Sequence, residues 1–386
     1  MKILHTSDWH LGRTLHGYSL IDDQSYMLDQ MIDYIKKEHI ELLIIAGDIY
    51  DKSLPNEEAV ALFNWFISKV VGELELPTVI IAGNHDSNIR LHFGSELFAS
   101  KQLYIIGECE KGYHRVTITA DETVDIYLIP YMEPAKVREI AGDEGIKRHD
   151  DAMRYLTSEI IKEKREVPTL LVVHAFVAGG DLSDSERRLC AVGTAEMVGA
   201  DCFMPFTYTA LGHLHKPQPI GAETIRYSGS LLKYSVSEAN QKKGFVKLEI
   251  ENGTLKGIEE VSLSPKRDLK VIEGPIEALI KAAAQLPEEN RQDYVYAKVE
   301  GKAIEDVVGL LRQVYPFILG AEFVSPKVKK GEEVERTSEF EAQRKKSLTE
   351  LFVEFMGYVG EADLNEEDMA YMNQVIREIE EGKNEA

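Results

Sequence analysis

The chain has 386 residues, of which 44% are hydrophobic and 28% charged, a composition typical of a globular protein with two or three domains. No segment holds the ~18 consecutive apolar residues that a membrane span needs. The first residues run straight into an apolar stretch, so we expect no signal peptide. The formal net charge of −22 argues against a protein that holds nucleic acid by its overall charge alone, although a local contact stays compatible with it. Cys109, Cys190 and Cys202 show no paired spacing, so we expect no disulfides, no cysteine zinc site and a cytoplasmic protein.

Short β-branched runs alternate with helical periodicity over residues 1–265. The runs predict strands over Ile3–Thr6, Leu42–Ala46, Thr78–Ala82, Leu103–Ile106, Val116–Ala120, Val124–Ile129, Thr169–His174, Tyr208–Gly212, Ile225–Ser228, Phe245–Glu251 and Leu255–Val261. Apolar spacing of three to four predicts helices over Asp22–Glu38, Glu57–Glu73, Arg90–Ala99, Ala135–Ala141 and Asp151–Lys164. The early strands are apolar throughout, as in covered parallel sheets, and the later ones alternate. We therefore expect an α/β fold of two stacked sheets between helical layers, in the order α-β-β-α.

A second, smaller unit is predicted after the sequence LSPKR. Residues 266–325 read as strand, helix, strand, helix and strand, which is enough for a small α/β domain. Residues 326–337 are charged and poor in apolar side chains, so we interpret them as a linker. The predicted boundaries are therefore 1–265 for the main domain and 266–325 for the small one.

The last segment, 338–386, is predicted to be a helical hairpin. Ser338 and Glu341 form a capping-box pattern, apolar residues recur at helical spacing from Leu348 to Val359, and a second helix follows Gly360. Residues 350–386 hold eleven acidic residues and two basic ones, so much of the negative charge belongs here. The hairpin either packs on its own protein or offers its apolar stripe to a partner. Its position beyond a charged linker favours the partner.

Polar side chains follow five of the predicted strands, where parallel strands bring their carboxyl ends to one rim. These groups are Asp8-Trp9-His10, Gly47-Asp48-Ile49-Tyr50-Asp51, Gly83-Asn84-His85-Asp86, His174 and Gly212-His213-Leu214-His215. An i, i+2 pair projects both side chains to the same side of an extended backbone. Histidine, carboxylate and amide ligands without thiolate suit Mn²⁺, Fe²⁺ or Zn²⁺. Seven such ligands suit two ions that share one carboxylate, an arrangement used for phosphoester hydrolysis.

The five groups, in this order, resemble the calcineurin-type metallophosphoesterases. More narrowly, the segments HTSDWHLGRTLHG, VVHAFVAGGDLSDSERR and GHLHKPQ, with RYSGSLLKYSVSE, are similar to the SbcD family of bacterial nuclease subunits. The likeness is close over the phosphoesterase domain, whereas the small domain and the tail match only in layout. It implies a four-layer sandwich with a small capping domain and a C-terminal helical hairpin.

The resemblance also assigns roles to individual residues. Asp8, His10, Asp48 and His215 would hold one ion, and the second would be held by Asp48, Asn84, His174 and His213. His85 would act outside the metal shell on the transition state and the leaving oxygen. Asp51 would orient His85, at a position where archaeal and eukaryotic relatives usually carry histidine. Asp86 has two interpretations, as a catalytic group or as a brace for its loop.

Contacts with DNA are predicted for Arg13, His16 and Arg90, each with a solvated loop as the alternative. A polar loop that follows His174 either lines the site or caps a helix; it contains Ser183, Ser185, Glu186 and Arg187. The nearest approach to a basic strip is formed by Lys216, Lys233, Lys242 and Lys243.

The resemblance implies a Mn²⁺-dependent DNA nuclease, with Mg²⁺, Fe²⁺ or Zn²⁺ as alternative ions. Its expected activities are 3′-to-5′ exonuclease on duplex ends and endonuclease on single strands and hairpins, in DNA repair and recombination. The expected partners are a second copy of the chain and the SMC-like ATPase SbcC, bound by the C-terminal hairpin in a nucleoid-associated heterotetramer that needs no membrane. Two alternatives share the fold: a small-molecule phosphatase or cyclic-nucleotide phosphodiesterase, and a scaffold without metal.

Overall fold

A computed structural model of the chain describes residues 1–187 and 196–324. The predicted linker (326–337) and helical hairpin (338–386) lie outside the described residues. Residues 1–323 belong to one compact unit. Among the described helices, none is both long and apolar enough to cross a membrane.

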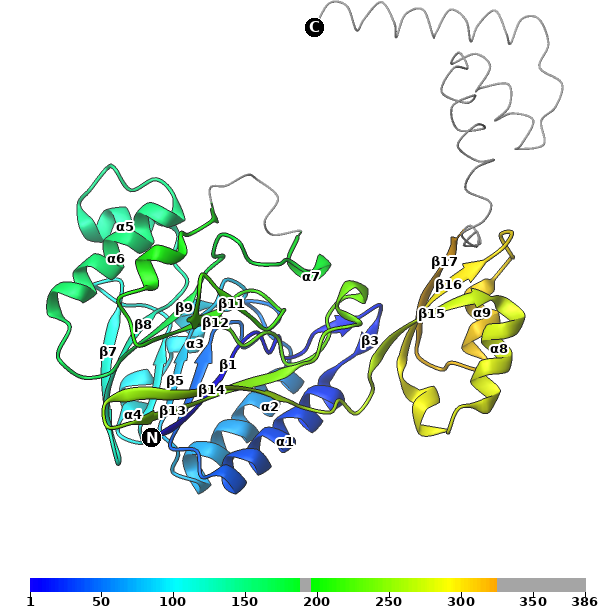
Figure 1. Cartoon of the computed structure of the whole chain (residues 1–386), viewed down its shortest axis with the longest axis horizontal. Coiled ribbons are helices and arrows are strands. Elements are labelled where there is room, and N and C mark those ends of the chain that lie inside the picture. Colours follow the sequence, from blue (N-terminus) through cyan, green and yellow to red (C-terminus); the bar gives the residue numbers. More distant parts are fainter. Residues whose placement is uncertain (188–195, 325–386) are drawn as a thin grey trace, which may run out of the picture. The chain divides into compact units, whose positions relative to one another are not determined.

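Two six-stranded sheets form the centre of the described chain (Figure 1). The first has the order β14-β13-β1-β4-β5-β6, in which β1, β4, β5 and β6 are parallel and β13 and β14 antiparallel. Its strands are β1 (Lys2–Thr6), β4 (Leu42–Ala46), β5 (Thr78–Ile81), β6 (Leu103–Ile106), β13 (Gly244–Glu251) and β14 (Thr254–Ser262). The all-apolar parallel strands and the alternating later ones are thus arranged as their sequences predict.

The second sheet has the order β11-β12-β10-β9-β8-β7, with a parallel centre and antiparallel edge strands. Its strands are β7 (His114–Thr119), β8 (Thr123–Ile129), β9 (Thr169–His174), β10 (Tyr208–Gly212), β11 (Gln218–Ile220) and β12 (Ala222–Tyr227). Residues of β9 and β10 pair in register up to His174 opposite Gly212, so both strands end at the same rim.

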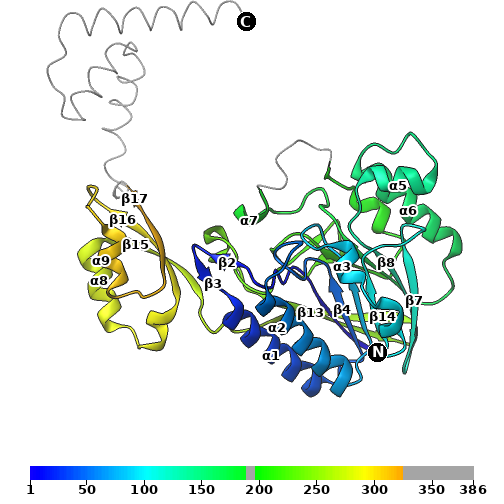
Figure 2. The same ribbon diagram turned by 180° about the vertical axis from the view of Figure 1, so that it is seen from behind.

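The two sheets lie face to face between helices, which confirms the predicted four layers (Figures 1 and 2). Because strand side chains alternate between faces, Leu43 packs on the outer helices while Ile44 faces the other sheet. In the second sheet, Leu170 faces the first sheet and Leu171 packs on its own outer helices. The outer helices are α1 (Ile21–Glu38), α2 (Glu57–Ile67), α5 (Pro134–Ala141) and α6 (His149–Glu163).

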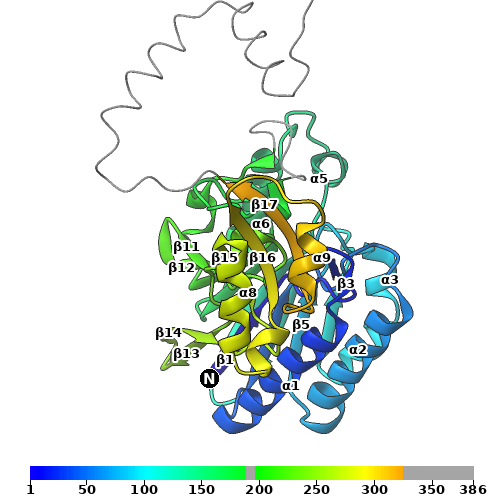
Figure 3. The same ribbon diagram turned by 90° about the vertical axis from the view of Figure 1, so that its right-hand side faces the viewer.

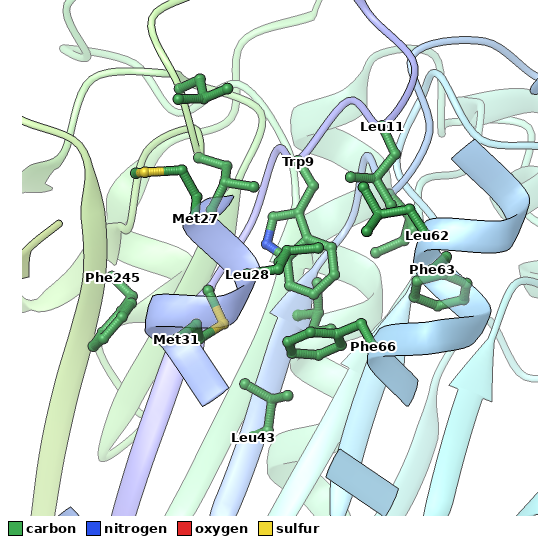
Figure 4. Close-up of a cluster of buried hydrophobic side chains, with 14 of the residues drawn as sticks. Trp9, Leu11, Met27, Leu28, Met31, Leu43, Leu62, Phe63, Phe66 and Phe245 are labelled. Carbon is green, nitrogen blue, oxygen red and sulfur yellow. The ribbon is translucent and has the colours of Figure 1, made fainter. Parts of the chain in front are cut away.

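Trp9 fixes the loop after β1 onto the core (Figure 4). Its ring is fully buried and packs edge-on against Phe66, with ring centroids 4.9 Å apart. Its indole N–H donates to the Thr6 hydroxyl at 2.9 Å, so the polar atom is satisfied inside the core. Asp8 and His10, on either side of Trp9, are therefore held by a rigid apolar anchor.

Two predicted helices differ from the structure. The helix expected over Arg90–Ala99 is broken into α3 (Asn88–His92) and α4 (Ser95–Ala99), because Gly94 takes a left-handed conformation with φ of 75°. The helix expected over Glu57–Glu73 continues past α2 as a π-helical turn over Ser68–Glu73. Short elements that the prediction lacks are β2 (Thr14–Leu15), β3 (Tyr18–Ser19), β11 (Gln218–Ile220), α7 (Asp184–Arg187) and the 3₁₀ turns Ala200–Phe203, Val236–Glu238 and Glu289–Gln292.

A small three-stranded sheet follows, with two helices on one face (Figure 3). Its elements are β15 (Leu269–Pro275), α8 (Ile276–Gln285), β16 (Tyr294–Glu300), α9 (Val307–Arg312) and β17 (Ile318–Val324). The other face meets the main core, where Tyr18 packs against Phe317 with centroids 5.4 Å apart. The buried Asp23 carboxylate pairs with Arg267 at 2.6 Å and accepts a hydrogen bond from the Tyr294 hydroxyl at 2.9 Å.

Candidate metal centre

Five loops meet at the rim where β1, β4, β5, β9 and β10 end, as the sequence predicts. The loops after β1 and β4 are joined by main-chain hydrogen bonds, from Asp8 N to Gly47 O and from His10 N to Asp48 O, both at 3.0 Å. Asp8, His10 and Asp48 have positive φ angles of 52°, 45° and 52°. Such angles are unfavourable for residues with a Cβ and persist only where the surroundings impose them. These hydrogen bonds and the buried Trp9 supply that constraint.

The first group of candidate ligands consists of Asp8, His10 and His215, whose ligand atoms lie within 4.8 Å of one another. The Nε2 atoms of His10 and His215 are 3.1 Å apart. Asp8 accepts hydrogen bonds from the main-chain N–H of His213 at 3.0 and 3.1 Å, so its carboxylate is fixed. All three side chains are buried.

The second group lies beside the first and contains Asp48, Asn84, His174 and His213. Asp8, Asp48 and His174 also place their ligand atoms within 4.8 Å of one another. The Asn84 side-chain oxygen lies 2.9 Å from His174 Nε2 and 3.1 Å from His213 Nδ1. Side chains at the ends of β4, β5, β9 and β10 therefore place their ligand atoms close together.

Asp48 connects the two groups. Its Oδ2 atom lies 3.6 Å from His10 Nε2 and 3.4 Å from His174 Nε2. Its Oδ1 atom accepts a hydrogen bond from the main-chain N–H of His85 at 2.9 Å. One carboxylate therefore stands between the two candidate ion positions.

Gly83 makes room for this carboxylate. A Cβ added at Gly83 would lie 2.2 Å from Asp48 Oδ1 and 2.4 Å from Asp48 N, far inside van der Waals contact. The residue before Asn84 must therefore be glycine if Asp48 is to keep its position.

The protonation of the site follows from burial and charge. Burial alone would raise the pKa of Asp48, but the surrounding histidines, His174 first, hold it well below its usual value. Burial would lower the pKa of His174, but Asp48 and Asp8 raise it to about 9. Burial and the His174 charge lower the pKa of His213 to about 3, and burial also holds the pKa of His10 well below its usual value. Neutral imidazole is the form that binds metal ions, so His10 and His213 are already in that form, whereas His174 would release a proton when an ion binds.

The donor atoms fit a pair of divalent cations. His174 holds its Nδ1 2.9 Å from the main-chain oxygen of Ala46, which fixes that nitrogen as the protonated one and leaves Nε2 for an ion. The Nε2 atoms of His10 and His215 lie 3.1 Å apart beside the carboxylates of Asp8 and Asp48, so the site gathers lone pairs that a cation would satisfy. Imidazole, carboxylate and amide donors suit Mn²⁺, Fe²⁺ or Zn²⁺.

His85 stands at the edge of the site, and Asp51 contacts it through the main chain. Its Nδ1 lies 2.9 Å from the main-chain oxygen of Asp51. The Asp51 carboxylate instead pairs with Arg13 at 3.1 Å and lies 3.7 Å from His10 Nδ1. Asp51 is therefore the hydrogen-bond partner of His85, as predicted, and its main-chain oxygen rather than its carboxylate makes the contact. Its role in orienting His85 stays a prediction. The His85 ring packs edge-on against His10, with centroids 4.7 Å apart.

Asp86 has the geometry of a brace rather than of a catalytic group. Its carboxylate accepts hydrogen bonds from the main-chain N–H groups of Ile49, Tyr50 and Gly83 at 3.1, 3.0 and 2.9 Å. Burial, together with the Asp48 charge, raises the pKa of Asp86 to about 7. The side chain joins the loop after β4 to the loop after β5.

The residues predicted to contact DNA lie near the site in different settings. Arg13 is paired with Asp51 and stacks over the Tyr234 ring, 4.9 Å from its centroid. His16 is exposed at the β2–β3 turn, and its ring centroid is 6.4 Å from that of Tyr296. Arg90 is exposed and donates to the Ser53 main-chain oxygen at 2.8 Å. Their contact with DNA stays a prediction.

The lysines do not form a basic strip. Lys243 is buried against Glu238, and Lys233 pairs with Asp268 at 2.7 Å.

Glu186 and Glu238, both buried, flank His215 together with Lys243. Burial would raise the pKa of Glu238, but Lys243 and His215 hold it well below its usual value. The sequence does not predict a role for Glu238, because no residue spacing links it to His215. The sequence SVSE indicates only a polar turn at this place.

Comparison with known proteins gives the family of the chain. The family model described as "Calcineurin-like phosphoesterase" matches residues 1–217, and the one described as "Type 5 capsule protein repressor C-terminal domain" matches residues 265–358. A protein of Staphylococcus epidermidis that is named as a subunit of the nuclease SbcCD is 39% identical over 324 residues, which are 83% of this chain and 84% of that protein.

Solved structures were also compared with the chain. A dimetal phosphatase from Danio rerio is 11% identical, with a TM-score of 0.39, over 68% of this chain and 97% of that one. A protein of Thermus thermophilus is 14% identical, with a TM-score of 0.39, over 66% of this chain and 96% of that one. From the family match and the curated relative, the chain belongs to the calcineurin-like phosphoesterases, hydrolases that depend on bound divalent metal ions, and within them it is a homologue of the SbcD nuclease subunit.

Proposed function

We propose that the chain is a Mn²⁺-dependent DNA nuclease subunit that hydrolyses phosphodiester bonds with two ions. The observation that carries this proposal is the position of Asp48, whose Oδ2 lies 3.6 Å from His10 and 3.4 Å from His174. One carboxylate between two ligand groups suits a pair of ions ~3.5–4 Å apart. Such a pair is suited to the attacking and leaving oxygens of an in-line displacement at phosphorus.

The residues divide the work as follows. Asp8, His10 and His215 would hold one ion, Asn84, His174 and His213 the other, and Asp48 both. When bound, the ions lower the pKa of water and neutralise phosphate charge. His85 keeps Nε2 free because Nδ1 faces the Asp51 main-chain oxygen. In the doubly protonated ring, Nδ1 would donate to the Asp51 main-chain oxygen and Nε2 would give its proton to the leaving oxygen, which leaves a neutral imidazole. Asp86 would keep the two loops in place.

The name of the relative supports a proposal for the substrate and the partner. That relative is named as a subunit of the SbcCD nuclease. We propose that this chain also acts with the ATPase SbcC, as an exonuclease on duplex ends from 3′ to 5′ and an endonuclease on single strands and hairpins. The segment proposed to bind the ATPase, 338–386, lies outside the described residues, and Arg13, His16 and Arg90 stay proposed DNA contacts.

An apolar surface supports a homodimer. Ile89, Phe93 and Leu97 on or next to α3 and α4 are 72%, 82% and 77% exposed. Leu54, whose neighbours Ser53 and Pro55 line the same groove as Phe93, is 70% exposed. A groove of about 620 Å³, lined by Phe63, Phe93, Phe98 and other apolar side chains, adjoins them. Exposed apolar clusters of this kind mark interaction sites, and homodimer interfaces are rich in them. We propose that a second copy covers this surface.

A comparison of substrates tests the proposal. Purified protein, alone and with the ATPase, is given linear duplex DNA, a DNA hairpin and p-nitrophenyl phosphate esters, each with Mn²⁺, Mg²⁺ or Zn²⁺. We expect cleavage of both DNAs, fastest with Mn²⁺. Hydrolysis of monoesters alone would instead indicate a small-molecule phosphatase, and absence of bound metal by elemental analysis would indicate a scaffold.

Two further experiments test the assembly. Co-purification of the ATPase with and without residues 338–386 tests the partner contact. Sedimentation of Phe93→Asp tests the dimer.

A further inference from the structure

A row of polar side chains contacts His215 through the ring nitrogen that does not face the candidate ion. The Ser185 hydroxyl lies 2.8 Å from His215 Nδ1 and donates to Glu238 Oε1 at 2.7 Å. The other oxygen of Glu238 lies 2.6 Å from Lys243 Nζ. The row therefore runs from His215 through Ser185 and Glu238 to Lys243.

Lys243 closes the row on the main chain of the same histidine. Its Nζ donates to His215 O at 2.7 Å and to Ser230 Oγ at 2.9 Å. The Glu238 and Lys243 side chains are 0% and 4% exposed. A buried ion pair of this kind contributes little to stability once desolvation is counted, so its presence points to a role in geometry.

The hydrogens of this row can be placed by counting donors. The carboxylate of Glu238 faces the Lys243 ammonium and accepts hydrogen bonds only. Ser185 has one hydroxyl hydrogen, which it gives to Glu238, so its oxygen must accept from His215 Nδ1. His215 is then protonated at Nδ1, and its Nε2 carries a free lone pair. That Nε2 is the atom that lies 3.1 Å from His10 Nε2, in the first group of candidate ligands.

We propose that Ser185, Glu238 and Lys243 are positioning residues that fix the tautomer and the ring orientation of His215 and so set the affinity of the ion position that Asp8, His10 and His215 share. This inference rests on the proposed two-ion function. The Nδ1 atom of His174 contacts the main-chain oxygen of Ala46, and that of His85 contacts the main-chain oxygen of Asp51. A side-chain substitution cannot remove either oxygen. The Nδ1 partner of His215 is a side-chain hydroxyl, so its contribution can be deleted.

Calorimetric titration of the metal-free full chain with Mn²⁺ is the test. We expect Ser185→Ala to weaken one of the two binding events by about 10- to 100-fold, the effect of removing an outer partner of a metal-bound histidine, and to leave the other event unchanged. Ser185→Thr keeps the hydroxyl and should restore the affinity.

Ser235→Ala is the matched control. Its hydroxyl donates to the same Glu238 Oε1, at 2.9 Å, and no contact of this hydroxyl with His215 is among those described. We expect this variant to bind both ions as the wild type does. Equal losses in Ser185→Ala and Ser235→Ala would overturn the proposal, since they would reflect a general disturbance of Glu238.

The tautomer supplies a readout that a merely structural role would not change. In ¹⁵N-histidine spectra of the metal-free protein, with His215→Gln used to assign the signal, we expect His215 to be protonated at Nδ1. In Ser185→Ala we expect protonation at Nε2 to become populated. An unchanged tautomer with unchanged Mn²⁺ affinity would refute the positioning role alone. Failure of the wild type to bind two ions would instead refute the proposed metal centre.

Discussion

His85 Nδ1 lies 2.9 Å from the main-chain oxygen of Asp51, while the Asp51 carboxylate pairs with Arg13. Because the peptide group makes the contact, the side chain at position 51 is not needed to orient His85. We expect Asp51→Asn to reduce kcat by less than about tenfold, well below the effect of losing a general acid. Steady-state kinetics on a DNA hairpin with Mn²⁺ measure this. A loss of kcat as large as that of His85→Ala would show that the carboxylate acts on His85.

Removal of the His85 ring should separate catalysis from metal binding. The ring packs beside His10 and belongs to neither group of candidate ligands that contains Asp8, while His10, Asp51 and His85 also place ligand atoms within 4.8 Å of one another. We expect His85→Ala to lower kcat by about 10²- to 10⁴-fold, the usual contribution of a positioned acid or base. Calorimetry with Mn²⁺ should still find two bound ions. Loss of an ion in this variant would make His85 a ligand and not a proton donor.

Gly83→Ala should disrupt the metal centre by steric contact alone. The new Cβ would meet Asp48 Oδ1 at 2.2 Å, so the carboxylate between the two ligand groups must move. We expect this variant to lose high-affinity binding of both Mn²⁺ ions in calorimetry. Gly72→Ala is the control, because a Cβ there meets nothing within 4 Å. If Gly83→Ala bound both ions normally, Asp48 would not be the shared ligand.

Long apolar runs made much of the fold predictable. Three strands end where the sequence predicts, because each mainly apolar run stops at a glycine or a polar residue: Leu42–Ala46, Leu103–Ile106 and Tyr208–Gly212. The rule that parallel strands share one rim then groups Asp8 with Asp48 in the first sheet and His174 with His213 in the second, and the stacking of the two sheets joins these groups.

The contacts that sequence could not predict depend on backbone atoms or distant neighbours. The break at Gly94 is a single left-handed residue inside helical periodicity. The Asp51 contact uses a main-chain oxygen, which no residue type reveals. The sequence alone suggests that Lys243 is a surface lysine, whereas the structure shows it buried and paired with Glu238. Each case is decided by the tertiary structure rather than by local spacing.

His5 should make stability depend on pH independently of the metal centre. It lies buried on β1, with Nδ1 3.0 Å from the Tyr208 hydroxyl, and burial lowers its pKa to about 3. Above pH ~6.5 the imidazole is neutral in both the folded and the unfolded chain. Below that pH the unfolded chain binds a proton that the folded chain does not. The free energy of unfolding should therefore fall by about 1.4 kcal/mol per pH unit until pH ~3, as far as His5 alone is concerned.

Urea unfolding of the metal-free protein at pH 7.5 and pH 5.0 measures this effect. We expect the wild type to lose about 2 kcal/mol more than His5→Asn between these values, because asparagine can replace the Nδ1 contact but does not titrate. His39→Asn is the control: His39 is exposed and has a positive φ of 55°, which asparagine tolerates, so this variant should show the wild-type pH dependence. Equal losses in wild type and His5→Asn would mean that His5 binds a proton as readily in the folded chain as in the unfolded one.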